Sequence, residues 1–132
     1  MADVTVKKVE EMDSVYEGMF VRARSSLGVS SFGMQIENFP PNSEHYPEHD
    51  EVNSGQEEIY TALQGSGRLI AGGEEYLLEP GVFARVGPGE KRRVLPGPDG
   101  IRLLVLGAVP GQVYEAPPWS EVGAPAPGTD NA

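Results

Sequence analysis

Cysteine is absent from the 132-residue sequence, which excludes disulfide bonds and thiolate chemistry. Basic residues are scarce as well: 10 Lys and Arg stand against 20 Asp and Glu, and the net charge is -10. A general affinity for nucleic acid or anionic lipid needs a basic face, so we expect neither as a partner. The one basic cluster is Lys91-Arg92-Arg93.

Long apolar runs are also missing. The longest candidate, residues 103–106, has the length of a strand, whereas a membrane helix needs about 20 residues. The first residues lack the basic start and apolar segment of a secretory signal. We therefore expect a cytoplasmic protein without a membrane span, and a mass of 14.2 kDa fits a single domain with one core.

No long stretch with helical periodicity follows residue 14, and only residues 9–15 are compatible with a short helical turn. Instead, 17 Gly and 12 Pro separate short runs rich in Val, Leu, Ile, Tyr and Phe. The predicted strands are residues 19–23, 32–38, 58–64, 68–71, 76–78, 82–86, 91–95 and 101–106, with a bend at 65–67 and a turn at 96–100. Short strands with frequent turns predict an all-β sandwich or small barrel.

The predicted strand at residues 58–64 carries apolar side chains on both of its faces. Alternation gives one face with Glu58, Tyr60, Ala62 and Gln64, and a second face with Ile59, Thr61 and Leu63. If the first face lines the interior, the second needs a cover. A second copy of the chain is the most economical cover, so we predict a homodimer.

The C-terminal segment is rich in proline, since five of the 12 prolines lie beyond residue 109. Pro117-Pro118 and the Ala-Pro-Ala-Pro run at 124–127 cannot join the interior of a sheet. Val113, Tyr114 and Trp119 are large apolar groups, so we expect this part to pack on its own barrel or on a neighbour. We predict a barrel with flanking arms over residues 1–119, with its core at 35–107, and a disordered tail over 120–132.

An acidic loop, HYPEHDEVNSGQEE at residues 45–58, holds both histidines and five acids but no Lys or Arg. Imidazole and carboxylate donors together suit Mn, Fe, Ni or Zn, and the candidate metal ligands are His45, His49, Glu51 and Glu58. Pro47 blocks a helix that would align the two histidines.

The order of motifs resembles the small single-domain cupins, a conserved-barrel family. Glu58, six residues and Gly65 match the second half of the first cupin motif, and Gly81, five residues and Gly87-Pro88-Gly89 follow the spacing of the second. The resemblance implies a double-stranded β-helix, or jelly-roll, barrel. It covers about residues 35–107.

In the family, three histidines and one glutamate form a metal site inside the barrel. The resemblance maps this set to His49, Glu51, Glu58 and Arg92. A carboxylate at Glu51 can still bind a metal, but the Arg92 guanidinium stays protonated and has no lone pair to offer. Its charge would also repel a cation, by about 4 kcal/mol for unit charges ~4 Å apart at an effective dielectric of about 20.

Three interpretations of the loop remain open. Arg92 takes the place of the metal and pairs with Glu58 and Glu51. In the second, a divalent ion binds His49, Glu51 and Glu58, and His45 or water completes its shell. The third is a solvated acidic loop with no specific role.

Three functions correspond to these interpretations. In the leading one the barrel binds a small polar or anionic ligand without a complete metal site. Its site residues are Arg92 as the anchor, surrounded by Glu58, Glu51, His49, Tyr60 and Gln64. The second is a metal-dependent enzyme, similar to cupin dioxygenases or isomerases, that uses His49, Glu51 and Glu58. The third is a structural or regulatory dimer with a vestigial pocket. No catalytic residue follows from the sequence.

Overall fold

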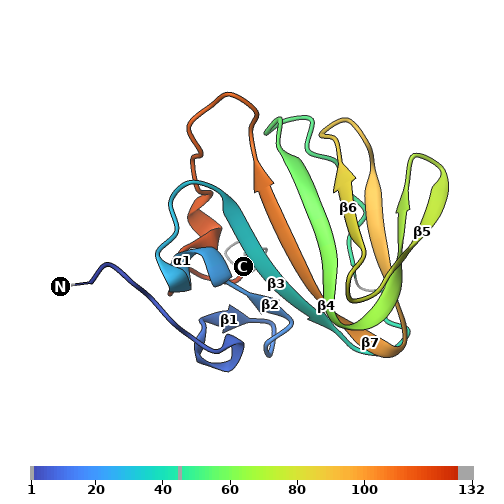
Figure 1. Cartoon of the computed structure of the whole chain (residues 1–132), viewed down its shortest axis with the longest axis horizontal. Coiled ribbons are helices and arrows are strands. Elements are labelled where there is room, and N and C mark those ends of the chain that lie inside the picture. Colours follow the sequence, from blue (N-terminus) through green and yellow to red (C-terminus); the bar gives the residue numbers. More distant parts are fainter. Residues whose placement is uncertain (1, 45, 128–132) are drawn as a thin grey trace.

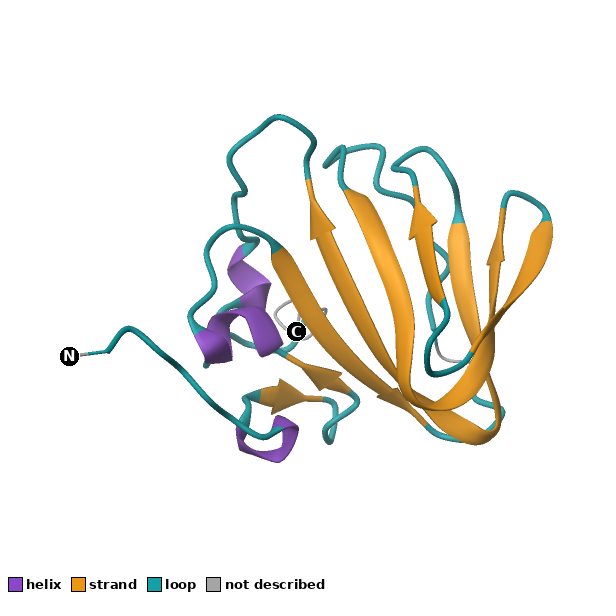
Figure 2. Cartoon of the chain, viewed as in Figure 1, coloured by secondary structure: helices purple, strands orange, loops and turns teal. Residues whose placement is uncertain are grey.

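The computed structural model describes residues 2–44 and 46–127, and it confirms the all-β prediction (Figures 1 and 2). The strands are β1 (Ser14–Val15), β2 (Phe20–Val21), β3 (Gly33–Phe39), β4 (Glu57–Ala71), β5 (Glu74–Leu78), β6 (Phe83–Val86) and β7 (Arg92–Ala108). The helical elements are short: η1 (Val9–Glu11), α1 (Ala23–Leu27) and η2 (Pro118–Ser120). Within the described residues, no helix has the length and apolar character needed to cross a membrane.

Helix α1 corrects the prediction that residues 19–23 form a strand and that helix is limited to one N-terminal turn. The strand ends at Val21, and the chain turns into the helix at Ala23. Gly28, in the left-handed conformation, ends the helix and donates its N–H to the carbonyl oxygens of Arg24 and Ser25. A helix of five residues is too short to show a 3.6-residue pattern in the sequence.

The sheet is built on two long strands, β4 and β7. They pair antiparallel from Glu57↔Ala108 to Ala71↔Arg92. β6 pairs with the first half of β4, and β5 pairs with the second half. β3 pairs with the second half of β7, so β3, β7 and β4 run side by side, with β1, β2 and α1 beyond the β3 edge (Figure 1).

The bend predicted at residues 65–67 and the turn predicted at 96–100 both lie inside continuous strands. The register between β4 and β7 shifts between Ala62 and Gln64 and again between Gly65 and Gly67. Gly65 has a φ of +70°, and a Cβ there would lie 2.1 Å from the carbonyl oxygen of Gly100. These glycines suggested a chain reversal. Instead, they allow the irregular pairing and the close approach of β4 and β7.

The second face of β4 differs from its prediction. Thr61 is buried, and its hydroxyl donates to the carbonyl oxygen of Val82 at 2.7 Å. Ile59 is half-buried, and only Leu63 of the three is exposed. The chain itself thus buries part of the face that we expected a second copy to cover.

Two apolar clusters cover opposite faces of β3. The barrel core contains Phe39, Tyr46, Tyr60, Ala62, Leu69, Ala71, Leu78, Val86, Val94, Ile101, Leu103 and Val105. Outside the barrel, Ile36 packs with Val21 and Ala23 beneath the N-terminal segment. Alternation along β3 then places Gln35 and Glu37 on the opposite face from Ile36, toward the barrel interior.

The C-terminal arm packs on the N-terminal segment of its own chain. Arg24 Nη2 lies 2.6 Å from Glu121 Oε1, and the Ser25 hydroxyl donates to the carbonyl oxygen of Ser120 at 2.7 Å. Arg22, which is buried and pairs with Asp13, also donates to the carbonyl oxygen of Pro125. These contacts fall within the predicted tail, whose last residues, 128–132, lie outside the described part. The division of the chain at 119/120 stays a prediction.

The close approach at Gly65 predicts a position-specific cost for a methyl group. Gly65→Ala and Gly73→Ala both force alanine into a left-handed conformation, which costs about 1 kcal/mol. At Gly73 the added Cβ meets nothing within 4 Å, whereas at Gly65 it meets the Gly100 carbonyl. We expect urea unfolding to show a loss of about 1 kcal/mol for Gly73→Ala and at least about 3 kcal/mol for Gly65→Ala. Equal losses would contradict the close approach of β4 and β7.

Candidate functional site

A cavity of about 290 Å³ lies between β3, β4, β7, the acidic loop and the C-terminal arm. Its ionisable lining side chains, tyrosines aside, are Glu37, His49, Glu51 and Glu58. Its aromatic lining side chains are Phe20, Tyr46, Tyr60, Tyr114 and Trp119. The cavity thus combines carboxylates with an aromatic wall, and no Lys or Arg is among the lining residues.

Backbone hydrogen bonds hold the acidic loop against the start of β7. The His49 N–H donates to the Arg92 carbonyl oxygen at 3.0 Å, and the Arg92 N–H donates to the His49 carbonyl oxygen at 2.8 Å. Two residues on, the Glu51 N–H donates to the carbonyl oxygen of Pro88 at 2.9 Å. The Gly87-Pro88-Gly89 turn and β7 therefore fix where the His49 and Glu51 side chains start.

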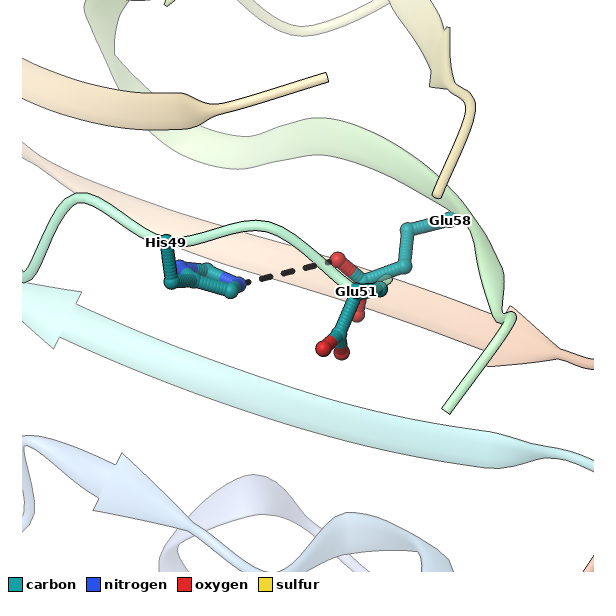
Figure 3. A group of neighbouring side chains, drawn as sticks. All are labelled: His49, Glu51 and Glu58. Carbon is teal, nitrogen blue, oxygen red and sulfur yellow. Dashed lines mark ion pairs between the residues drawn. The ribbon is translucent and has the colours of Figure 1, made fainter. Parts of the chain in front are cut away.

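His49, Glu51 and Glu58 form one cluster, drawn in Figure 3. Each offers a potential ligand atom, and these atoms all lie within 4.8 Å of one another. His49 Nε2 lies 3.9 Å from Glu58 Oε1, which is an ion-pair distance but too long for a hydrogen bond. The structure thus brings three of the four candidate metal ligands together. The fourth, His45, lies outside the described residues.

Arg92 is fully buried behind Glu58. Its Nη2 donates to the carbonyl oxygen of Gly87 at 2.8 Å, and its Nη1 lies 3.8 Å from Glu58 Oε1. Arg92 is not among the residues that line the cavity. The guanidinium therefore influences the cavity through Glu58, and it offers no lone pair to a metal.

A chain of hydroxyl groups orients the Glu58 carboxylate. The Tyr60 hydroxyl donates to Glu58 Oε1 at 2.9 Å, and the Tyr46 hydroxyl donates to the Tyr60 oxygen at 3.2 Å. Both tyrosines are buried, and burial raises the pKa of each phenol, so both remain protonated donors at neutral pH. Glu58 is thereby fixed at the centre of the site.

Gln64 does not belong to the site. The sequence analysis placed it on the interior face with Glu58 and Tyr60, but its side chain is exposed and lies outside the cavity lining. The register shift between Ala62 and Gln64 breaks the alternation on which that expectation depended. The expectation that Gln64 shares the interior face of Glu58 and Tyr60 is therefore wrong.

Glu37 lines the cavity but was not among the residues expected there. The residue is 7% exposed and lines the cavity, and its carboxylate has no hydrogen-bond or ion-pair partner in the described part of the chain. Burial and the Glu58 carboxylate raise the pKa of Glu37 to about 7, although His49 opposes this shift. The signal that could have found it is the alternation Gln35, Glu37, Phe39 in the predicted strand.

The charges of the cluster also act on one another. The contact with Glu58 raises the pKa of the His49 imidazole. Burial, followed by the Glu58 carboxylate, raises the pKa of Glu51. The Glu58 carboxylate contributes to both shifts, so additional positive charge near it would be favourable.

Comparison with known proteins establishes the fold. No protein-family model matches the chain, and no curated protein matches it. A cupin protein from Bacteroides fragilis is similar, with a TM-score of 0.64, 23% identity, and coverage of 89% of this chain and 93% of the other. A sugar phosphate isomerase from a cupin superfamily, from Silicibacter pomeroyi, is also similar. Its TM-score is 0.62 and its sequence identity is 17%, and the alignment covers 79% of this chain and 75% of the other.

A third similar structure is the Cupin_2 domain of an XRE family transcriptional regulator from Enterobacter cloacae. It has a TM-score of 0.54 and 16% identity, and the alignment covers 61% of this chain and 83% of that one. These likenesses show that the chain has the cupin fold, and they confirm the resemblance seen in the sequence motifs.

The buried carboxylate of Glu37 predicts a pH-dependent stability. Between pH 4.5 and about 7 the unfolded chain loses the Glu37 proton while the folded chain keeps it, so this residue lowers stability as the pH rises through that window. Glu37→Gln removes the penalty. We expect urea unfolding to show a gain of about 1 to 3 kcal/mol at pH 8, and a much smaller difference at pH 4.5.

The matched control is Glu79→Gln, because Glu79 is exposed and lies outside the cavity lining. It should change stability by less than about 0.5 kcal/mol at either pH. A Glu37→Gln variant with the same relative stability at both pH values would show that Glu37 is not a desolvated carboxylate.

Proposed function

We propose that this protein binds a small polar molecule in the cavity of its cupin barrel. The observation that carries the proposal is that the side chains of Glu58, Glu51, His49 and Tyr60 all border one cavity of about 290 Å³. A concave site with a few placed polar groups in an apolar or aromatic wall is typical of small-molecule binding. A cytoplasmic location, which the lack of cysteine favours, belongs to the same proposal.

Each polar group has a distinct role in this proposal. Glu58 accepts from a ligand donor while the Tyr60 hydroxyl holds its Oε1 in place. His49 and Glu51 contact the ligand beside Glu58, from a loop that the Arg92 backbone fixes. Because Arg92 does not line the cavity, we assign it the role of counter-ion to Glu58. With no Lys or Arg among the lining residues, a polar ligand is favoured over an anionic one.

A divalent metal centre is the second candidate, and the cluster of His49, Glu51 and Glu58 is the observation that favours it. One imidazole and two carboxylates suit Mn, Fe, Ni or Zn. A bound ion would supply a Lewis acid for a metal-dependent reaction. The donors fit a three-ligand site, but Arg92 cannot complete it and holds a positive charge 3.8 Å from Glu58.

Trp119 allows a direct test of ligand binding, because it is the only tryptophan of the chain and it lines the cavity. Untagged protein is titrated with sugars, polyols, amines and carboxylic acids while tryptophan fluorescence is recorded. We expect at least one class to give a saturable change, and we expect Glu58→Gln to weaken that binding at least tenfold, or about 1.4 kcal/mol. The exposed-site variant Glu79→Gln should bind like the parent protein.

Metal analysis of the same untagged protein separates the two candidates. The proposal expects no stoichiometric Mn, Fe, Ni or Zn and no effect of EDTA on the thermal unfolding midpoint. A stoichiometric metal that His49→Ala removes would establish the metal centre instead. The absence of a saturable response to every class of compound would contradict ligand binding.

We also infer that the protein is a homodimer. Large apolar side chains gather around a groove between β5 and β6, and we call this surface the β5–β6 patch; its exposed members are Tyr76, Leu77, Val82 and Phe83. A contiguous exposed apolar patch is typical of an interface. A second copy is the most economical partner, because in a two-fold dimer the β5–β6 patch of each copy covers the same patch of the other.

The dimer is tested by light scattering at micromolar concentration, where the parent chain is expected to have twice the monomer mass. Phe83→Asp places a charge on a side chain that is 70% exposed within the patch, and we expect it to give a monomer. Val113→Asp makes the same kind of change at a residue that is 88% exposed outside the patch, and it should leave the dimer intact. A monomeric parent protein would contradict the inference.

A further inference from the structure

We propose that the ligand of the barrel cavity is an organic cation, a compact ammonium group with apolar substituents; this inference rests on the proposed binding function. The first support is the charge of the cavity wall. Glu37, Glu51 and Glu58 line it, and His49 is the only basic side chain among the lining residues. The guanidinium of Arg92 lies behind Glu58 and is directed to the Gly87 carbonyl oxygen.

The second support is the unpaired carboxylate of Glu37. This residue is 7% exposed, its carboxylate faces the cavity, and no described residue donates a hydrogen bond to that carboxylate or forms an ion pair with it. A buried carboxylate without a partner is costly, and such groups are normally paired or hydrogen-bonded. Glu58 differs, since the Tyr60 hydroxyl donates to it. A cation in the cavity would give Glu37 the partner that the chain itself does not supply.

The third support is the aromatic part of the wall. Phe20 from β2 and Trp119 from the C-terminal arm meet edge to face, with ring centroids 5.5 Å apart. Tyr114, Tyr46 and Tyr60 border the same cavity. Aromatic faces attract ammonium groups by about 0.5 to 2 kcal/mol, and they disfavour anions because the ring face is electronegative. A wall that combines carboxylates with aromatic rings suits a charged head with methyl or methylene groups.

These observations favour an organic cation over a metal ion. A metal would use His49, Glu51 and Glu58 alone, and it would leave the aromatic wall and Glu37 without a function. The cavity of about 290 Å³ is also larger than an ion requires. A substituted ammonium ion spreads a single charge over a larger apolar surface, which matches the distribution of carboxylates and rings.

A set of three molecules with nearly the same shape tests the charge preference. Choline is the cation, 3,3-dimethylbutan-1-ol is its neutral counterpart, and 3,3-dimethylbutanoate is an anion of similar size. Each is titrated into the untagged full chain at pH 8 up to tens of millimolar, with Trp119 fluorescence and calorimetry as readouts. We expect saturable binding of choline, at least tenfold weaker binding of the alcohol, and none of the anion.

Variants identify the carboxylate that is responsible. Glu37→Gln should weaken choline binding at least tenfold and leave the weak binding of the alcohol unchanged. Glu79→Gln, outside the cavity, should bind choline like the parent chain. The thermal unfolding midpoint of each variant verifies that it is folded, and the comparison of probes on the parent chain needs no variant.

The outcomes distinguish failure of this inference from failure of the proposed function. Binding of the alcohol or the anion as tightly as choline would retain a polar-ligand site and overturn the cation. Saturation by Zn²⁺ or Mn²⁺ alone, with no response to choline, would also overturn the organic cation and favour the metal centre. No response to any of these probes would count against both the cation and the proposed binding function.

Discussion

The pairing of a fully buried guanidinium with Glu58 is the interaction that determines the character of the site. Arg92 Nη1 lies 3.8 Å from Glu58 Oε1, and the residue has no exposed surface. A buried charge is tolerated only with a partner, and removing either member would leave the other uncompensated. Because Arg92 is held by the Gly87 carbonyl oxygen and by Glu58, its positive charge is kept from the cavity surface. The wall that remains is acidic.

The fold explains why these groups meet. β4 carries Glu58 and Tyr60 at its start, and Arg92, the first residue of β7, pairs with Ala71 at the far end of β4. The curvature of the two long strands brings the Arg92 side chain back to Glu58. The acidic loop returns to this point through the reciprocal hydrogen bonds between His49 and Arg92. β3, which pairs with β7, adds Glu37 to the same cavity. The fold thus gathers an imidazole and three carboxylates, although they come from three separate parts of the chain: β3, the acidic loop and the start of β4.

Much of this arrangement was predictable from local patterns, and the exceptions have physical causes. Alternation placed Glu58 and Tyr60 on one face because both precede the irregularity in β4, while Gln64 follows it and points outward. The motif spacing identified Arg92 as the residue at the position where the cupin family has its last metal-binding histidine. Its depth was not predictable, because it depends on a carbonyl group of the Gly87 turn that only the folded chain brings close.

Other features depend on contacts between distant segments. The sequence predicted that Trp119 packs on a surface but did not identify that surface. In the structure Trp119 packs beside Phe20, from β2. Glu37 lies in a correctly predicted strand, but its burial arises because its side chain faces a cavity that β4, the acidic loop and the C-terminal arm enclose. Helix α1 was too short to leave a periodic signal. Local patterns therefore identified most strands, whereas tertiary contacts decided which polar side chains became buried.

The most direct test of the account is a crystal structure of untagged protein at neutral pH, with anomalous scattering recorded for transition metals. The account predicts that the Arg92 guanidinium is buried between the Gly87 carbonyl oxygen and Glu58, with no anomalous peak at His49, Glu51 and Glu58. A strong anomalous peak held by these three residues, with the Arg92 side chain turned away from Glu58 into solvent, would contradict it.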